Sequence, residues 1–300
     1  MGRWRDDITG GARQVLTRAA LILVTIILFL NLVGKSYPGN YSFSRIRLPG
    51  SAGIFATQAH AIDSTGRVVG DSQAGAVCFL YADGKFSTFK VPFSNAFGTS
   101  AWGINDSAEI VGYFTSSTGA HGFLKKAAVF TTIDNPAGTE TSAHAINNRG
   151  EIVGTFTEGA NVHGFLLAKG VFSTIDAPGR RDDIPGYRNT FPYGVNDSGH
   201  IVGYVSSFSP GISFSGFLYR GGSFTRIEVP GADETFAQGI NNHNQVVGYY
   251  KTSGGYRGFL YSNGAFTSID VPEAKQTLAQ GINDAGLIVG SFDRRCPGPC

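Results

Sequence analysis

The 300-residue sequence predicts an all-β fold, and three observations lead to this prediction. A motif close to Ile-Asn-x-x-Gly-x-Ile-Val-Gly occurs six times between Ile62 and Gly290. Two further motifs, Gly-Phe-Leu and Phe-x-x-Ile-Asp-x-Pro, recur after it in the same order. Beyond residue 40 the apolar runs are short and bounded by Gly, Asn and Pro, which is typical of strands, and there is no sustained helical period.

The spacing of the repeats predicts how the strands are grouped. The glycines that close the first motif are 42 to 49 residues apart, at Gly70, Gly112, Gly154, Gly203, Gly248 and Gly290. A glycine-rich, strand-like period of this length is typical of propeller blades. In the fifth unit we expect strands at 236–241, 245–250, 257–261 and 265–271, joined by tight turns. The sequence therefore predicts a β-propeller of six blades, each with about four short antiparallel strands.

The two ends of the repeat region predict how the ring closes. The region begins with a lone outer-strand segment at 41–48 and ends after the two inner strands of the sixth unit. Pairing of these N- and C-terminal segments would complete one blade and leave no open sheet edge. The third strand of that blade has no counterpart among the motifs, so residues 34–41 and a three-stranded blade both remain possible. A five-bladed ring with loose ends and an unclosed array are the alternatives.

Glycine inside the strands predicts close contact between backbones. Each such glycine costs about 0.5 to 1 kcal/mol relative to alanine. Ten positions of this kind would cost roughly 5 to 10 kcal/mol, which is comparable to the net stability of a domain. We therefore expect a neighbouring backbone, or a bulge, at a place where a Cβ atom would clash. Cys78 stands at one of these glycine positions and is interpreted as a small buried residue.

The first 36 residues belong to a different class. Residues 19–33 are apolar except for Thr25 and Asn31, and we expect one N-terminal hydrophobic helix there. At about 1.5 Å per residue this helix spans roughly 22 Å, shorter than the ~30 Å hydrocarbon core, and flanking basic side chains would extend its reach. A transmembrane anchor and a cleaved signal peptide, both within 19–36, stay open as interpretations.

Basic residues before the apolar run predict its orientation. The tail 1–18 contains four arginines and is expected to stay in the cytoplasm. The repeat domain, 37–300, is then periplasmic or extracellular, and in the anchor interpretation residues 19–33 hold it at the inner membrane. The membrane is expected to contact the protein through this N-terminal segment only, and we expect a monomer.

Charge and cysteine content narrow the partners. Without residues 1–18 the chain carries 20 basic and 20 acidic residues, so the repeat domain is close to neutral. Phosphate binding requires a concentrated basic face, and we therefore expect no nucleic-acid partner. Cys296 and Cys300 flank Pro-Gly-Pro, where a small terminal disulfide and an unpaired tail are both possible.

The repeats resemble a known group, the HAF repeats, which are described as probable extracellular repeats. The resemblance rests on Gly-Ile-Asn-x-x-Gly-x-Ile-Val-Gly, Gly-Phe-Leu and Phe-x-x-Ile-Asp-x-Pro-Gly, and it covers residues 41–293. It implies an exported bacterial β-propeller-like protein, and it implies no established activity and no catalytic residues. The first copy departs from the pattern, with Asp63 for Asn, Cys78 for Gly and Lys90 for the acidic residue.

One position varies between the copies while its neighbours stay constant, which is how repeat proteins place their binding residues. It precedes the Ile or Val of the innermost strand by two residues and is occupied by His60, Trp102, His144, Tyr193, Gln238 and Gln280. If these strands line a central channel, the six side chains form a ring of aromatic, imidazole and amide groups. Such a ring suits a sugar or another neutral polar ligand, and the alternative is that the side chains only pack between blades or face water.

Other candidate residues point less directly to a function. The period of 49 residues contains a long loop with Arg180, Arg181, Tyr187 and Arg188, which are candidate contacts on a rigid scaffold. The acidic residues that recur in the outer strands, such as Asp134, are interpreted as structural because catalysis needs one asymmetric arrangement. We predict no metal site and no cofactor, since no His or Cys cluster has a ligand spacing.

Two classes of function follow from these observations. The favoured one is an exported, non-enzymatic module of the bacterial cell envelope that binds a protein or a glycan through one propeller face. The alternative is a propeller enzyme, a hydrolase or lyase, that acts on carbohydrate. The sequence contains no nucleophile elbow, phosphate loop or metal motif that would support the alternative.

Overall fold

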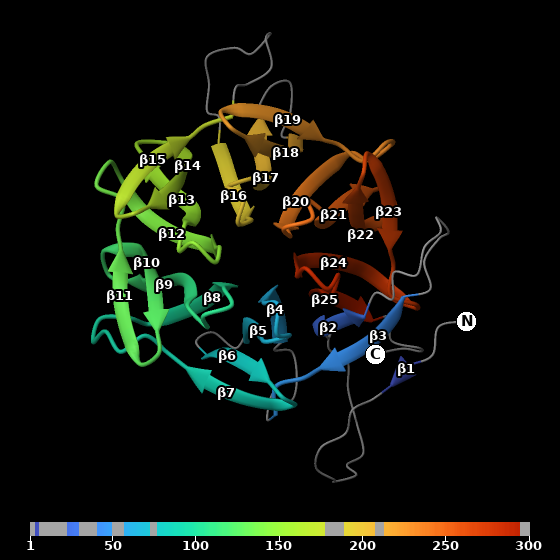
Figure 1. Cartoon of the computed structure of the whole chain (residues 1–300), viewed down its shortest axis with the longest axis horizontal. Coiled ribbons are helices and arrows are strands. Elements are labelled where there is room, and N and C mark those ends of the chain that lie inside the picture. Colours follow the sequence, from blue (N-terminus) through green and yellow to red (C-terminus); the bar gives the residue numbers. More distant parts are fainter. Residues whose placement is uncertain are drawn as a thin grey trace.

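A computed structural model shows an all-β propeller whose sheets are arranged around a central axis (Figure 1). The structure describes residues 4–5, 23–29, 41–49, 57–72, 77–177, 189–207 and 213–294. Five sheets have four antiparallel strands each, and a sixth sheet of five strands is built from both ends of the chain. The prediction of an all-β propeller is therefore confirmed, but there are five regular four-stranded blades rather than six, and a composite sheet of five strands closes the ring.

The five regular blades follow one another along the chain. The first has β4 (Thr57–Ile62), β5 (Val68–Ser72), β6 (Val77–Ala82) and β7 (Lys85–Phe89). The second has β8 (Gly98–Ile104), β9 (Ile110–Ser116), β10 (Gly119–Lys126) and β11 (Val129–Ile133). The third has β12 (Thr139–Ile146), β13 (Ile152–Glu158), β14 (Asn161–Ala168) and β15 (Val171–Ile175). The fourth has β16 (Asn189–Val195), β17 (Ile201–Ser207), β18 (Ser213–Arg220) and β19 (Ser223–Ile227). The fifth has β20 (Glu234–Ile240), β21 (Val246–Thr252), β22 (Gly255–Ser262) and β23 (Ala265–Ile269), which confirms the four predicted strands.

The closing sheet joins the two ends of the repeat region. Its order is β1 (Trp4–Arg5), β3 (Ser42–Ile46), β2 (Leu23–Phe29), β25 (Ile288–Arg294) and β24 (Ala274–Ile282). The N-terminal outer strand β3 thus completes a blade begun by the C-terminal strands, as the sequence predicts. The third position, between β25 and β3, is filled by β2.

The prediction of an N-terminal helix is wrong for Leu23–Phe29, which form a strand. The predictions of residues 34–41 as the third strand and of a three-stranded last blade are wrong for the same reason. A short apolar run does not distinguish a buried strand from a helix by periodicity. Here β25 and β3 offer unpaired backbone groups on both sides, and a run rich in Ile, Val and Thr fits that position. The rest of 19–36 lies outside the described residues, and among those described there is no helix with the length and apolar character of a membrane span.

The turn after each innermost strand explains the first motif. Asn147 accepts bonds with its side-chain oxygen from the backbone N–H groups of Arg149 (3.0 Å) and Glu151 (2.9 Å). Its amide nitrogen donates to the carbonyl of Asn196 in the next blade at 2.9 Å. Gly150 follows in the left-handed region, with φ of 76°, where a side chain would be strained.

The same link between blades recurs around the ring. Five asparagines, each at the same place in the motif, donate to a carbonyl of the following blade, namely Asn105, Asn147, Asn196, Asn241 and Asn283. Asp63 has no amide to donate, and Arg67 takes over. Its guanidinium binds the Asp63 carboxylate and donates to the carbonyl of Asp106 at 2.7 Å. The Asn of the motif is therefore a clamp between blades.

The glycine that closes the motif is required by packing, as predicted. A Cβ atom at Gly248 would lie 2.0 Å from the carbonyl oxygen of Phe236 on the paired innermost strand. The equivalent distances in the other sheets are 1.8 to 2.0 Å. Cys78 is fully buried and free, which agrees with its interpretation as a small buried residue.

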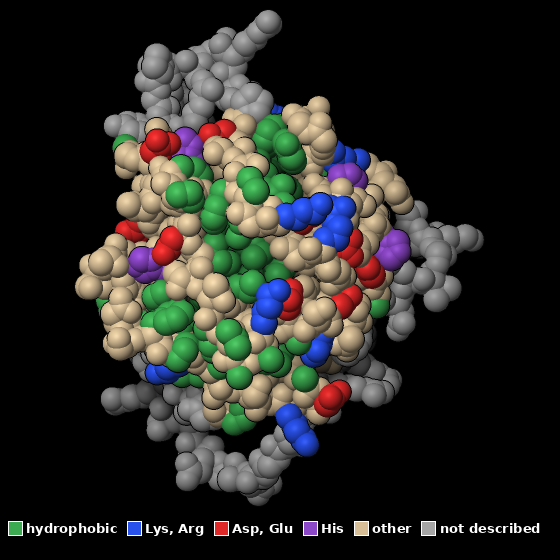
Figure 2. Space-filling view, turned by 60° about the vertical axis from the view of Figure 1, so that its left-hand side comes forward, with side chains coloured by type: hydrophobic (Ala, Val, Ile, Leu, Met, Phe, Trp, Pro, Cys, Tyr) green, Lys and Arg blue, Asp and Glu red, His purple; other side chains and the backbone are tan. Residues whose placement is uncertain are grey.

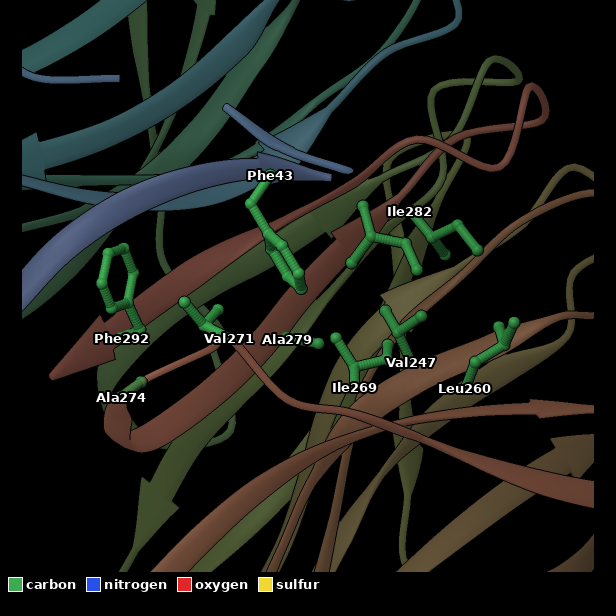
Figure 3. Close-up of a cluster of buried hydrophobic side chains, with 10 residues drawn as sticks. Phe43, Val247, Leu260, Ile269, Val271, Ala274, Ala279, Ile282 and Phe292 are labelled. Carbon is green, nitrogen blue, oxygen red and sulfur yellow. The ribbon is translucent and has the colours of Figure 1, made fainter. Parts of the chain in front are cut away.

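The hydrophobic core lies between neighbouring sheets rather than at the axis. Figure 3 shows one such cluster, in which Val247, Leu260 and Ile269 of the fifth blade meet Ile282 and Phe43 of the closing sheet. Inside each regular blade, the Phe of Gly-Phe-Leu contacts the Phe of the outer strand, for example Phe165 and Phe172 at 5.3 Å between ring centroids. On the face shown in Figure 2, acidic and basic side chains are interspersed.

Candidate functional site

The six variable residues lie together around the axis, because each innermost strand has a β-bulge. The register of every innermost strand skips one residue, for example between Ala101 and Gly103 in β8. A bulge adds one residue to a strand and re-aims its side chain. The skipped residues are His60, Trp102, His144, Tyr193, Gln238 and Gln280, which we call the ring. The structure therefore places the predicted residues at equivalent positions, while their binding of a ligand stays a proposal.

The channel along the axis is narrow. Five of the ring residues, all except His144, line a cavity of about 80 Å³ together with the next layer of residues, which are Ile or Val in all six sheets. Below that apolar layer, a second cavity of about 70 Å³ is lined by the Asn and Asp residues of the turns. Sites for drug-sized ligands occupy about 300 to 1,000 Å³, so these cavities suit water or a very small polar group rather than a sugar ring.

The aromatic residues of the ring partly cover one another's faces by stacking. His60 stacks on Trp102, with 4.2 Å between centroids, and His144 stacks on Tyr193 at 4.4 Å. Nδ1 of His144 also lies 2.8 Å from the carbonyl oxygen of Pro192, to which it donates. Burial is the main reason why the pKa of His144 is lowered to about 4, and the nearby His60 lowers it further. His144 is thus a neutral packing residue.

Other polar atoms of the ring lack a well-aligned hydrogen bond among the described residues. Both ring nitrogens of His60, which is 5% exposed, lack a well-aligned hydrogen bond. The side-chain oxygen of Gln280, in the neighbouring sheet, is also buried without a partner. Both residues line the 80 Å³ cavity. Because buried polar groups are normally satisfied, these atoms indicate polar occupants of the channel.

A second layer of variable side chains lies at the end of the channel beyond the ring, away from the turns. It consists of one cross-strand pair in each sheet. One member is on the innermost strand, two residues before the ring residue, and the other is on the second strand, directly after the closing glycine of the motif. In the first and second blades these pairs are Gln58 with Asp71 and Ser100 with Tyr113. We call the whole layer the mouth layer, and its members are Gln58, Asp71, Ser100, Tyr113, Ser142, Thr155, Phe191, Tyr204, Phe236, Tyr249, Leu278 and Ser291.

Two of the six pairs, in the fourth and fifth blades, are wholly aromatic, and we call this side of the mouth layer its aromatic half. Phe191 stacks on Tyr204 at 4.9 Å, and Phe236 stacks on Tyr249 at 4.8 Å. Tyr204 also meets Phe236 edge-on at 5.0 Å across the blade boundary and stacks on Tyr193 of the ring at 5.4 Å. Burial raises the pKa of Tyr204 and of Tyr249, so both phenols stay neutral donors at ordinary pH.

The opposite half is polar and contains a carboxylate. The hydroxyl of Ser100 donates to Oδ2 of Asp71 and accepts a bond from Nε1 of Trp102 at 2.8 Å. Nε2 of His60 lies 3.3 Å from the same Asp71 oxygen. Burial alone would raise the pKa of Asp71, but the nearby His60 imidazole and the Ser100 hydroxyl outweigh this effect and hold the pKa below its ordinary value.

The other residues that the sequence analysis singled out are the loop contacts and the outer-strand acids. The loop contacts Arg180, Arg181, Tyr187 and Arg188 lie outside the described residues. The outer-strand acids form ion pairs within their blades, such as Asp134 with His121 at 2.9 Å, consistent with a structural role. In the part of the chain that is described, no group of three or more His, Cys, Asp or Glu side chains is arranged to hold a metal ion.

The sequence analysis missed the mouth layer, although the sequence pattern could have identified the six of its residues that follow the closing glycines. The residue after the closing glycine is Asp71, Tyr113, Thr155, Tyr204, Tyr249 and Ser291 in the six copies. It varies beside a constant neighbour, just as the ring position does. The criterion that identified the ring would therefore have identified this position too.

Comparison with known proteins supports the fold. No protein-family model matches the chain, and no curated protein matches it. Among solved structures, a putative TolB from Agrobacterium tumefaciens is similar with a TM-score of 0.63 and 12% identity, over 91% of this chain and 99% of that one.

Two further structures are more distant. A virginiamycin B lyase from Staphylococcus aureus has a TM-score of 0.48 and 14% identity, over 89% of this chain and 87% of that one. The Aleuria aurantia lectin has a TM-score of 0.46 and 14% identity, over 84% and 94%. At 12% identity the likeness to the TolB structure concerns the fold alone.

Proposed function

We propose that this protein is a non-enzymatic binding module of the bacterial cell envelope, which holds a glycan at the mouth layer of its propeller. The observation that carries the proposal is the division of this layer into an aromatic half and a polar half. Six structurally equivalent pairs of residues would be expected to be alike if they served packing only. Here they differ, and they combine broad apolar faces with a few hydrogen-bonding groups, as ligand sites do.

The ring forms the floor of this site in our proposal. The 80 Å³ cavity beneath the mouth layer is too small for a sugar, so the sugar would lie on the mouth layer itself. Water in the cavity would connect the ligand to the unpartnered atoms of His60 and Gln280. Trp102 would act mainly through its indole N–H network with Ser100, because one of its faces is covered by His60.

The proposed location outside the cytoplasm rests on the N-terminal sequence and on the resemblance to HAF repeats. Four arginines precede an apolar run, which is the pattern of an export signal or anchor. The structure gives part of this run, Leu23–Phe29, a second role as strand β2. Cell fractionation combined with N-terminal sequencing of the mature protein tests both roles, and recovery in the cytoplasm would contradict export.

Glycan-array binding by the purified full-length chain tests the function. We expect retention of a glycan without release of product. Tyr204→Ala removes the ring that touches Phe191, Phe236 and Tyr193, and it should reduce retention by about tenfold or more, as expected for loss of a stacking anchor of about 1 to 3 kcal/mol. Tyr219→Ala, on an outer part of the same blade, is the matched control and should bind normally. Equal retention by the two variants would refute the site.

The alternative, an enzyme acting on carbohydrate, finds one supporting observation in the Asp71 and His60 pair. Hydrolysis of glycosides normally uses two carboxylates. Among the described residues, no second carboxylate forms an ion pair or hydrogen bond with a ring residue. Release of product in the binding assay, lost in Asp71→Asn, would favour the enzyme over the binding module.

A further inference from the structure

We propose that the polar half of the mouth layer recognises a protonated amino group, so that the preferred ligand is an amino-bearing glycan rather than a neutral one. This inference rests on the proposed function, and it deepens that function by naming the ligand's chemistry. Its starting point is Asp71, a carboxylate whose side chain is 15% exposed and which is the one acidic or basic member of the mouth layer.

The hydrogen-bond pattern around Asp71 fixes its role as an acceptor. Ser100 has one hydroxyl proton. Because Trp102 donates its N–H to the Ser100 oxygen, that proton is free to point at Oδ2 of Asp71. The arrangement suits an ionised carboxylate. The Tyr113 phenol lies beside the same hydroxyl, and burial together with the Asp71 charge raises its pKa, so it adds a neutral donor rather than a second charge.

No permanent cation neutralises this carboxylate. Among the described residues, neither a lysine nor an arginine forms an ion pair with Asp71, whereas Asp63 has Arg67 and Glu234 has Lys251. His60 is the one basic neighbour at 3.3 Å, and it is poorly aligned for a hydrogen bond. Since His60 is charged only when it is protonated, an ammonium group on a ligand would give Asp71 a full ion-pair partner.

The neighbouring aromatic rings favour the same ligand. Trp102 and Tyr113 of the second blade lie near Asp71 of the first blade. Tyr193 and Tyr204 of the fourth blade extend this group of aromatic rings. Indole and phenol rings have electron-rich faces that attract cations. Together they give an amino sugar two kinds of contact, the carboxylate for its ammonium group and the aromatic half for its ring.

Calorimetric titration of the full-length chain with matched oligosaccharides tests the proposal. The probes are oligomers of glucosamine, which carry free amines, and the same oligomers with N-acetylated, neutral amines. We expect wild type to bind the free-amine oligomers at least about tenfold more tightly, the ratio typical of a charge-assisted hydrogen bond. Asp71→Asn, which keeps the side-chain shape, should abolish this preference. Ser100→Ala, which keeps the charge, should retain most of it.

The control and a third probe separate the possible failures. Asp284→Asn removes a carboxylate at the turn end of the channel and should leave the preference unchanged. Equal binding of both oligomers by wild type and Asp71→Asn would overturn the amine proposal and leave the glycan-binding function standing. Binding of benzylamine in an Asp71-dependent manner, without binding of either oligomer, would refute the glycan and support the amine site. Binding of none of the three probes would overturn both.

Discussion

Acidification should destabilise the fold through His144, a residue buried in the ring. Its pKa is about 4 in the folded chain, against an ordinary value of 6.5. Below pH 6.5 the unfolded chain binds a proton at this residue while the folded chain does not, so the stability that is present above pH 6.5 is lost as the pH falls. At about 1.4 kcal/mol per pH unit, the full loss is about 3 kcal/mol at pH 4.

The effect is measurable well before that limit. At pH 5 the loss is roughly 2 kcal/mol, equivalent to a melting temperature lower by roughly 4 to 8 °C for a domain of this size. The assay is urea or thermal unfolding between pH 7 and pH 5 for wild type, His144→Gln and His243→Gln. His243 lies exposed in a turn and is the control. We expect a shallower pH dependence in His144→Gln alone, and three parallel curves would refute the assignment of a neutral, buried His144.

Three other predictions concern the scaffold. Asn147→Asp removes the donor that links two blades at 2.9 Å and places a carboxylate beside a carbonyl, so denaturant titration should show a loss of about 2 to 4 kcal/mol; an unchanged midpoint would contradict the clamp. Gly248→Ala should abolish soluble expression because its Cβ would lie 2.0 Å from a carbonyl oxygen, whereas Gly254→Ala, with 3.6 Å to its nearest atom, should express normally; similar yields would argue against the close approach. Deletion of residues 1–36 removes β2 and exposes the edge of β25, so size-exclusion chromatography should show association and thermal unfolding should shift downward, while a stable monomer would show that β2 is dispensable.

The fold was predictable because its physical requirements repeat. The six copies of the closing glycine reveal a place where two backbones meet. The Asn of the same motif, which is replaced by Asp63 in the first copy, reveals the clamp between blades, and both residues are visible in the sequence. The closing sheet could not be predicted in full. Leu23–Phe29 carries none of the repeated motifs, and an apolar run alone is compatible with a helix, a leader or a strand.

The positions of the candidate site residues were predictable from the sequence, but the contacts between their side chains were not. Variation beside constant neighbours identified the ring, because the bulge that aims those side chains inward needs the same small residues around it in every copy. The pairing of His60 with Trp102 could not be foreseen, since it depends on the rotamers of side chains from two blades. For the same reason, the sequence did not show that Asp71 lies beside Ser100, 29 positions further along the chain.

The composite sheet has a consequence for the order of folding. Each regular blade is contiguous in sequence and can form from local contacts, whereas β2 pairs with β25 through partners as distant in sequence as Leu23 and Asp293. Closing so large a loop is entropically expensive and slow. We therefore expect the closing sheet to assemble last, after the five regular blades have formed. Pulsed hydrogen exchange during refolding should show late protection of the amides of β24 and β25, and early protection there would exclude this sequence of events.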